Sequence, residues 1–244
     1  MIKKRALAAG LWAAGTLLVL AAPAQAALIF FDNRADFELA SGLSGITEDF
    51  EEANVGVGTV EFTSSPLNSA TNDGIFSFGD IADGLTILSS DDSDVAVLGS
   101  GILGLSKMVG SSNFDASTVL LLSPAVLAIG FDVFLVEPAN IAVSVFDENG
   151  LSLGSTTVSG LGNATPNFLG IVSDMSGIAR LTIDDLNIGA EAVDNVTFGN
   201  PVAAQLPEPG SLALFGLGLL GLGVAVRRRH CLARPHLQSS STPS

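Results

Sequence analysis

Carboxylates are the side chains in this 244-residue sequence that could do chemistry. Of its 25 aspartate and glutamate residues, 24 lie between Ala27 and Leu206. The only basic residues in that stretch are Arg34, Lys107 and Arg180, so its net charge is about −21. Carboxylate oxygens are the ligands that Ca²⁺ prefers, and two carboxyl groups suffice for glycoside hydrolysis. The same charge repels nucleic acid, and we expect no nucleic-acid partner.

The other reactive side chains are missing from this stretch. His230, Cys231 and His236 all follow residue 226, Trp12 precedes residue 27, and there is no tyrosine. This distribution excludes Ser-His-Asp and Cys-His catalysis, disulfides and zinc sites between residues 27 and 205. It also argues against sugar binding on tryptophan or tyrosine rings. We therefore predict a protein that is not an enzyme, with a glycoside hydrolase built on carboxylates alone as the least favoured alternative.

Three carboxylates are candidate calcium ligands. Asp49 and Glu51 lie near the start of the acidic stretch and Asp194 near its end. Strict alternation places Asp194 on the same face as the core candidates Val196 and Phe198, and an inward-facing carboxylate needs a partner. The final strand also resembles that of carbohydrate-binding-module-like jelly rolls, some of which hold calcium between their first and last strands. We predict that Asp49 or Glu51 shares a calcium ion with Asp194, unless Asp194 lies in water at a strand end. We predict no other cofactor.

The acidic stretch is patterned as β-structure. Short apolar runs alternate with Gly, Ser, Thr, Asn and Asp at roughly ten-residue spacing, which is typical of antiparallel strands. In the clearest strand, 126–136, Ile129, Phe131 and Val133 share one face and Asp132 lies on the other. A turn at Asp147–Gly150 connects the next two strands, 141–145 and 151–158. Further strands are predicted at 28–31, 46–50, 59–63, 85–88, 95–98, 168–172, 178–183 and 193–198, with a helical turn at 36–39.

These elements predict an all-β fold. Eight to twelve short antiparallel strands in residues 27–205 favour an antiparallel β-sandwich of jelly-roll type, followed by a single C-terminal transmembrane helix. About 179 residues are enough for one domain with a substantial core.

Three different pieces follow the sandwich in a fixed order. Pro207, Glu208 and Pro209 form a rigid extended stretch. Ser211–Val226 is apolar on every side, and as a helix of ~1.5 Å rise per residue it spans ~24 Å of a ~30 Å hydrocarbon core. Arg227, Arg228 and Arg229 then stop translocation and stay on the cytoplasmic side, followed by a short cytoplasmic tail at 231–244.

The N-terminal 26 residues predict a signal peptide. Lys3, Lys4 and Arg5 are its basic region and 6–20 its apolar region. Ala24 and Ala26 match the small-residue pattern at which signal peptidase cleaves. Cleavage there places residues 27–205 outside the cytoplasm. The arginine cluster predicts the same orientation.

Residues 206–230 resemble the PEP-CTERM sorting signal, which combines a Pro-Glu-Pro motif, a short transmembrane helix and a basic cluster. The resemblance implies an exosortase-type processing enzyme as partner and an exopolysaccharide-producing Gram-negative bacterium as source. It also implies an inner-membrane-anchored intermediate that is then delivered to the cell surface or extracellular matrix. This chain departs from the usual pattern in having 15 residues after the arginines. The alternative function is a calcium-dependent carbohydrate-binding module with exopolysaccharide as ligand.

Overall fold

The computed structural model describes residues 27–43, 45–161, 165–186 and 189–201. The predicted signal peptide, Pro-Glu-Pro motif, transmembrane helix, arginine cluster and tail lie outside the described residues. Within the described ranges, no helix is both long and apolar enough to cross a membrane.

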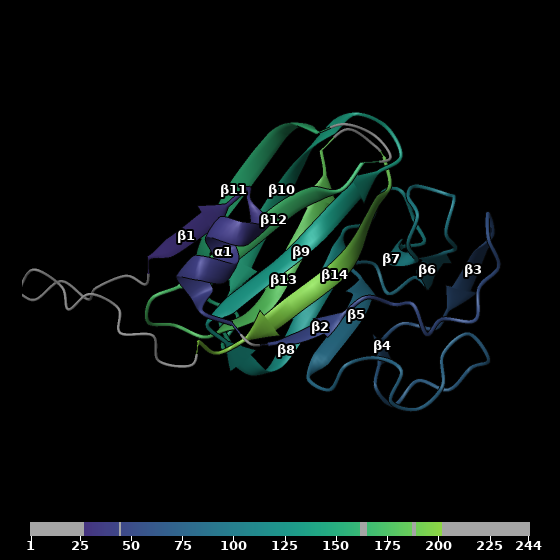
Figure 1. Cartoon of the computed structure of the whole chain (residues 1–244), viewed down its shortest axis with the longest axis horizontal. Helices are drawn as coiled ribbons and strands as arrows, with labels where there is room; N and C mark the ends of the chain where they lie inside the picture. The colour runs from purple at the N-terminus through teal and green to yellow at the C-terminus, as the bar shows by residue number, and fades with distance from the viewer. Residues whose placement is uncertain (1–26, 44, 162–164, 187–188, 202–244) are drawn as a thin grey trace, which may run out of the picture. The chain divides into compact units, whose positions relative to one another are not determined.

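Two antiparallel sheets make up the described part of the chain (Figure 1). The strand order of the larger sheet is β1-β12-β9-β14-β7-β6-β3, with β2 paired to β14. The order of the smaller sheet is β11-β10-β13-β8-β5-β4. The strands of the larger sheet are β1 (Leu28–Phe31), β2 (Ile46–Glu48), β3 (Val60–Thr63), β6 (Val95–Leu98), β7 (Met108–Ser111), β9 (Ala128–Leu135), β12 (Asn167–Ser173) and β14 (Glu191–Gly199). Those of the smaller sheet are β4 (Leu67–Asn68), β5 (Leu85–Ser89), β8 (Thr118–Val126), β10 (Ala139–Phe146), β11 (Ser152–Leu161) and β13 (Ile178–Asp185).

The apolar core lies between the two sheets. Alternate residues of β9 (Ile129, Phe131 and Val133) are fully buried and meet Val143 and Val145 of β10 in one cluster. Burial of alternate side chains from both sheets is the signature of a sandwich. The predicted antiparallel, two-layered all-β architecture is therefore confirmed.

The sequence pattern did not identify β4, β7 and β8. Strand β8 contains the uninterrupted apolar run 119–122, in which no period of two can be recognised. The predicted turn between β10 and β11 is present. Its Asp147 Oδ1 accepts hydrogen bonds from the backbone N–H groups of Asn149 and Leu151, and Gly150 has the positive φ of 77°.

Helix α1 (Arg34–Ser41) is longer than the predicted turn at 36–39. Asn33 caps its N-terminus by accepting hydrogen bonds from the backbone N–H groups of Ala35 and Asp36. Gly42, with φ 57°, ends it in the left-handed conformation. Because the helix is short, we expect its position to depend on the side chain that it buries.

Phe37 attaches α1 to the outer face of the larger sheet. Its side chain is fully buried, and its ring lies 6.1 Å from that of Phe31 and 5.6 Å from that of Phe168. Two glycines directly opposite each other, Gly130 of β9 and Gly170 of β12, leave the space for this ring. A Cβ atom at Gly170 would lie 2.5 Å from Phe37 Cδ2, and one at Gly130 would lie 2.7 Å from Phe37 Cε1.

Substitution of Gly170 tests whether the Phe37 ring is what requires glycine at this position. We expect Gly170→Ala to lower the free energy of unfolding by about 1–3 kcal/mol because the added methyl group overpacks Phe37. In a Phe37→Ala background, the same glycine substitution should cost much less, since the clashing ring is gone. Denaturant unfolding of the two single variants and the double variant measures this coupling. Additive effects would show that Phe37 is not what requires glycine at position 170.

Candidate functional site

A β-bulge in β14 determines which of its side chains face the core. Asp194 lies opposite Asp132 of β9, but Thr197 lies opposite Gly130, so β14 has one residue more than its partner between these positions. Asn195 takes up the extra residue with a φ of 50°. The alternation of core-facing and outward-facing side chains along β14 is therefore reversed after the bulge.

The bulge corrects the predicted face of Asp194. Val193, Val196 and Phe198 belong to the core cluster. Asp194 does not share their face, because it precedes the extra residue and points, with Asp132, to the outer side of the sheet. The prediction assumed strict alternation through the whole strand, which a bulge breaks.

Asp194 is nevertheless fully buried, under the loop that precedes β7. Its Oδ2 accepts a hydrogen bond from Ser106 Oγ at 2.6 Å, and its Oδ1 accepts one from the backbone N–H of Asn195 at 2.6 Å. Burial raises the pKa of Asp194 to about 6; the hydrogen bonds from Ser106 and Asn195 partly offset this rise, and the nearby carboxylates of Asp132 and Glu51 add to it slightly. This is a buried acid among like charges.

Asn195 connects Asp194 to the partly exposed ion pair between Arg34 and Asp132. Its Nδ2 donates to Asp132 Oδ2 at 3.0 Å and to Asp194 Oδ2 at 3.2 Å. Arg34 Nη2 lies 3.1 Å from the same oxygen of Asp132. The Arg34 guanidinium also lies 4.5 Å from the centroid of the Phe168 ring. A continuous polar chain thus runs across the outer face of the sheet, between α1 and the loop before β7.

The structure brings Glu51 close to Asp194. Two consecutive residues bridge them, since Ser106 Oγ donates to Asp194 and the backbone N–H of Lys107 donates to Glu51 Oε1 at 2.9 Å. Lys107 Nζ donates to the carbonyl oxygens of Glu51 and Ala53, at 2.8 and 2.7 Å. The carboxylate pair therefore has an ammonium group close by.

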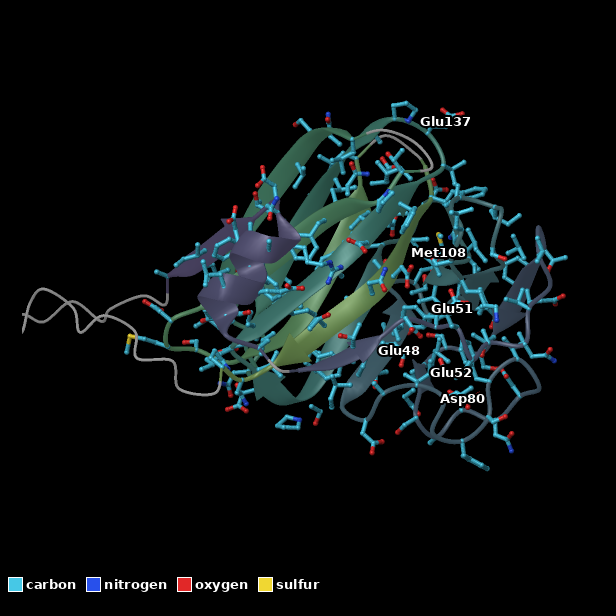
Figure 2. All side chains as sticks on the ribbon, viewed as in Figure 1. Glu48, Glu51, Glu52, Asp80, Met108 and Glu137 are labelled. Atoms are coloured by element: carbon cyan, nitrogen blue, oxygen red, sulfur yellow. The ribbon has the colours of Figure 1, made fainter. Side chains whose placement is uncertain are left out.

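Asp49 belongs to a different carboxylate group. One ligand atom each of Glu48, Asp49 and Glu52 lies within 4.8 Å of the others. Figure 2 labels Glu48 and Glu52 of this group, together with Glu51. Glu48 already accepts backbone hydrogen bonds at both oxygens, from Phe50 at 2.8 Å and Ala82 at 2.7 Å. The two predicted alternatives, Asp49 and Glu51, thus fall into separate groups, and Glu51 is the one beside Asp194.

The sequence reasoning missed a buried carboxylate, Glu191. It begins β14 before the bulge, on the core face with Val193, and its Oε1 accepts a hydrogen bond from the backbone N–H of Thr118 at 2.7 Å. Thr118 Oγ1 accepts from the N–H of Ser111, so the contact joins strands of both sheets. Burial raises the pKa of Glu191 to about 7, partly offset by its hydrogen bonds to Thr118. Counting back two residues from Val193 could have found it.

The comparisons with known proteins identify the C-terminal segment. A family model described as the PEP-CTERM protein-sorting motif matches residues 205–229. The chain carries a PEP-CTERM sorting motif. The resemblance of residues 206–230 is thereby confirmed, although the match covers about a tenth of the chain. No curated protein matches the chain in sequence.

Several solved structures share the sandwich at low similarity. A family 29 carbohydrate-binding module from Piromyces equi is 9% identical, with a TM-score of 0.35, 57% of this chain covered and 89% of that one. The CBM22-1 xylan-binding domain from Paenibacillus barcinonensis Xyn10C is 15% identical, with a TM-score of 0.33 and 65% and 95% covered. An adhesin domain of Lys-gingipain from Porphyromonas gingivalis W83 is 13% identical, with a TM-score of 0.33 and 65% and 99% covered. At these scores they say nothing about what this chain binds.

Glu191 makes stability depend on pH. The folded state keeps a proton on Glu191 up to a pKa of about 7, whereas the unfolded chain releases it near 4.5. The free energy of unfolding should therefore fall as pH rises between these values and then level off. Glu191→Gln should remove the contribution of Glu191 to this slope and leave that of Asp194, whose pKa is raised to about 6. The variant should be more stable than wild type by roughly 2–3 kcal/mol at pH 8 but not at pH 4.

Thermal and denaturant unfolding across pH 4–8, with chelator present, measures the effect. Glu61→Gln on the exposed edge strand β3 removes the same charge and should leave the slope unchanged. Parallel curves for wild type and Glu191→Gln would contradict the assignment.

Proposed function

We propose that the protein is an exported, non-enzymatic cell-surface or exopolysaccharide-matrix protein that is sorted through its C-terminal signal. The observation that carries this proposal is the PEP-CTERM motif at 205–229. In this proposal signal peptidase removes residues 1–26, and a transmembrane helix at 211–226 then anchors a jelly-roll sandwich from outside. Arg227–Arg229 remain cytoplasmic, and an exosortase cleaves near Pro207–Pro209.

The composition of the sandwich suits this role. A net charge of about −21 on residues 27–206 keeps them soluble and repels anionic lipid head groups. Association with the membrane before processing therefore depends on the apolar segment. The absence of cysteine between residues 27 and 205 means that folding outside the cytoplasm needs no disulfide formation.

The sorting motif can be separated from the anchor by mutation. We expect the triple variant Pro207→Ala, Glu208→Ala, Pro209→Ala to stay in the membrane fraction at the mass of the signal-peptide-cleaved chain, because the apolar segment and arginines are unchanged. The released, shortened product should fall at least tenfold. Intact-mass analysis of the membrane and medium fractions of an exosortase-containing Gram-negative host reports both chain ends.

Pro201→Ala, which removes a proline just ahead of the matched motif, is the control and should be processed normally. Release of the triple variant at the mass and in the amount of wild type would contradict the proposal that Pro-Glu-Pro is recognised.

We further propose that the Glu51–Asp194 pair holds a structural calcium ion. The support is the position of Asp194, a fully buried carboxylate with the carboxylates of Glu51 and Asp132 nearby. Carboxylate oxygens and the Ser106 hydroxyl are all donors of the kind that Ca²⁺ accepts. A bound cation would join the start of the sandwich to its last strand.

Calcium binding predicts a higher melting temperature in millimolar calcium than in chelator. Asp194→Asn should abolish this shift, because an amide supplies a weaker, uncharged ligand. Asp49→Asn is the matched control, since Asp49 lies with Glu48 and Glu52, and it should keep the shift. Loss of the shift in Asp49→Asn alone would assign the ion to that other group, and an identical wild-type melt in both buffers would exclude the ion.

A further inference from the structure

A polar groove lies between α1 and β2. Its volume is about 460 Å³, within the roughly 300–1,000 Å³ of small-molecule sites. Its lining comes from α1, from β2 and from the outer face of β14. It is lined by Arg34, Glu38, Leu43, Gly45, Thr47, Asn195 and Thr197.

Arg34 is held in place at one wall of this groove. Its Nη2 donates to Asp132 Oδ2 at 3.1 Å and to the carbonyl oxygen of Asn195 at 3.5 Å, while its guanidinium packs on Phe168. Among the described residues, the hydrogen bonds of this guanidinium all use Nη2. A guanidinium has five N–H donors, so those of Nη1 and Nε are available to a ligand. A side chain already fixed by packing loses little entropy on binding.

The remaining wall and floor supply hydroxyl groups and an acceptor. Thr47 Oγ1 of β2 and Thr197 Oγ1 of β14 lie 2.9 Å apart and are hydrogen-bonded to each other at an exposed position. The hydroxyl that donates in this pair can accept further hydrogen bonds, and the other can also donate one. Glu38, exposed on α1, adds a carboxylate, and Leu43 adds an apolar contact.

The charges around the groove select against anionic ligands. Asp132 neutralises Arg34, and Glu38 adds a negative charge, which disfavours a carboxylate, sulfate or phosphate. A neutral ligand with several closely spaced hydroxyl groups matches this set of donors and acceptors.

We propose that the groove binds a neutral glycan through several of its hydroxyl groups. Arg34 donates hydrogen bonds from Nη1 and Nε to separate hydroxyl oxygens of the glycan. Glu38 and the threonine hydroxyls accept hydrogen bonds from the sugar. This goes beyond the proposed sorting and calcium roles and depends on neither. Because no tryptophan or tyrosine is available for stacking, a single site binds weakly and a multivalent display is the appropriate probe.

The test uses the purified full chain in detergent on an array of neutral oligosaccharides of glucose, galactose, mannose and xylose, with uronic-acid oligomers alongside. We expect the wild-type protein to bind at least one class of neutral oligosaccharide on the array. Arg34→Met, which keeps the apolar stem over Phe168, should weaken that binding roughly tenfold or more. The double variant Thr47→Val, Thr197→Val should also weaken this binding. If Arg34→Met does not fold, this double variant still tests the groove.

Arg180→Met is the matched control. Arg180 lies on β13 of the other sheet, 4.0 Å from the centroid of the Phe146 ring, so its loss removes the same charge and a similar cation–π contact. It should bind as wild type does. Three results would overturn the proposal: no retention of any neutral oligosaccharide, retention of uronic-acid oligomers only, or wild-type affinity in both groove variants. Secretion and processing of the groove variants are measured separately and should be normal, so failure here leaves the sorting proposal standing.

Discussion

The bulge at Asn195 is the constraint on which the polar side of this sandwich depends. Strand β14 lies centrally in the larger sheet, between β9 and β7, and presents Val193, Val196 and Phe198 to the core. Without the extra residue, Val193 and Val196 could not both do so, since they are three positions apart. Asparagine is among the few non-glycine residues that tolerate positive φ at modest cost. One residue thus keeps the core apolar and aims Asp194 outward.

Once Asp194 points outward, its burial has to come from elsewhere. The loop before β7 covers it, and Ser106 and Asn195 supply hydrogen bonds. Glu191, three residues earlier on the same strand, faces the core and is stabilised by Thr118 of the opposite sheet. The two buried acids of β14 therefore differ in kind. Glu191 joins the two layers of the sandwich in its neutral form, whereas Asp194 lies among other carboxylates, where a positive charge would stabilise it.

The sequence predicted those features that depend on local periodicity. Strand β9 and the turn at Asp147–Gly150 were found because alternation and turn residues are strong local signals. Features that depend on partners distant in sequence were not found. The local sequence around Gly130 and Gly170 does not indicate that these glycines make room for the Phe37 ring. The sequence around Asn195 does not indicate that β14 has one residue more than β9 at this point. The predicted face of Asp194 was wrong for the same reason, since strict alternation ignores a bulge that only pairing with β9 reveals.

The three basic residues of the sandwich are all engaged within it. Arg34 contacts Asp132 and packs on Phe168, and Arg180 packs on the ring of Phe146. Lys107 donates to the carbonyl oxygens of Glu51 and Ala53. Since each cation is held at an internal contact, the long-range field that this surface presents is almost wholly negative. Anionic partners are repelled before contact, so recognition here has to come from short-range hydrogen bonds to neutral ligands or from bound cations.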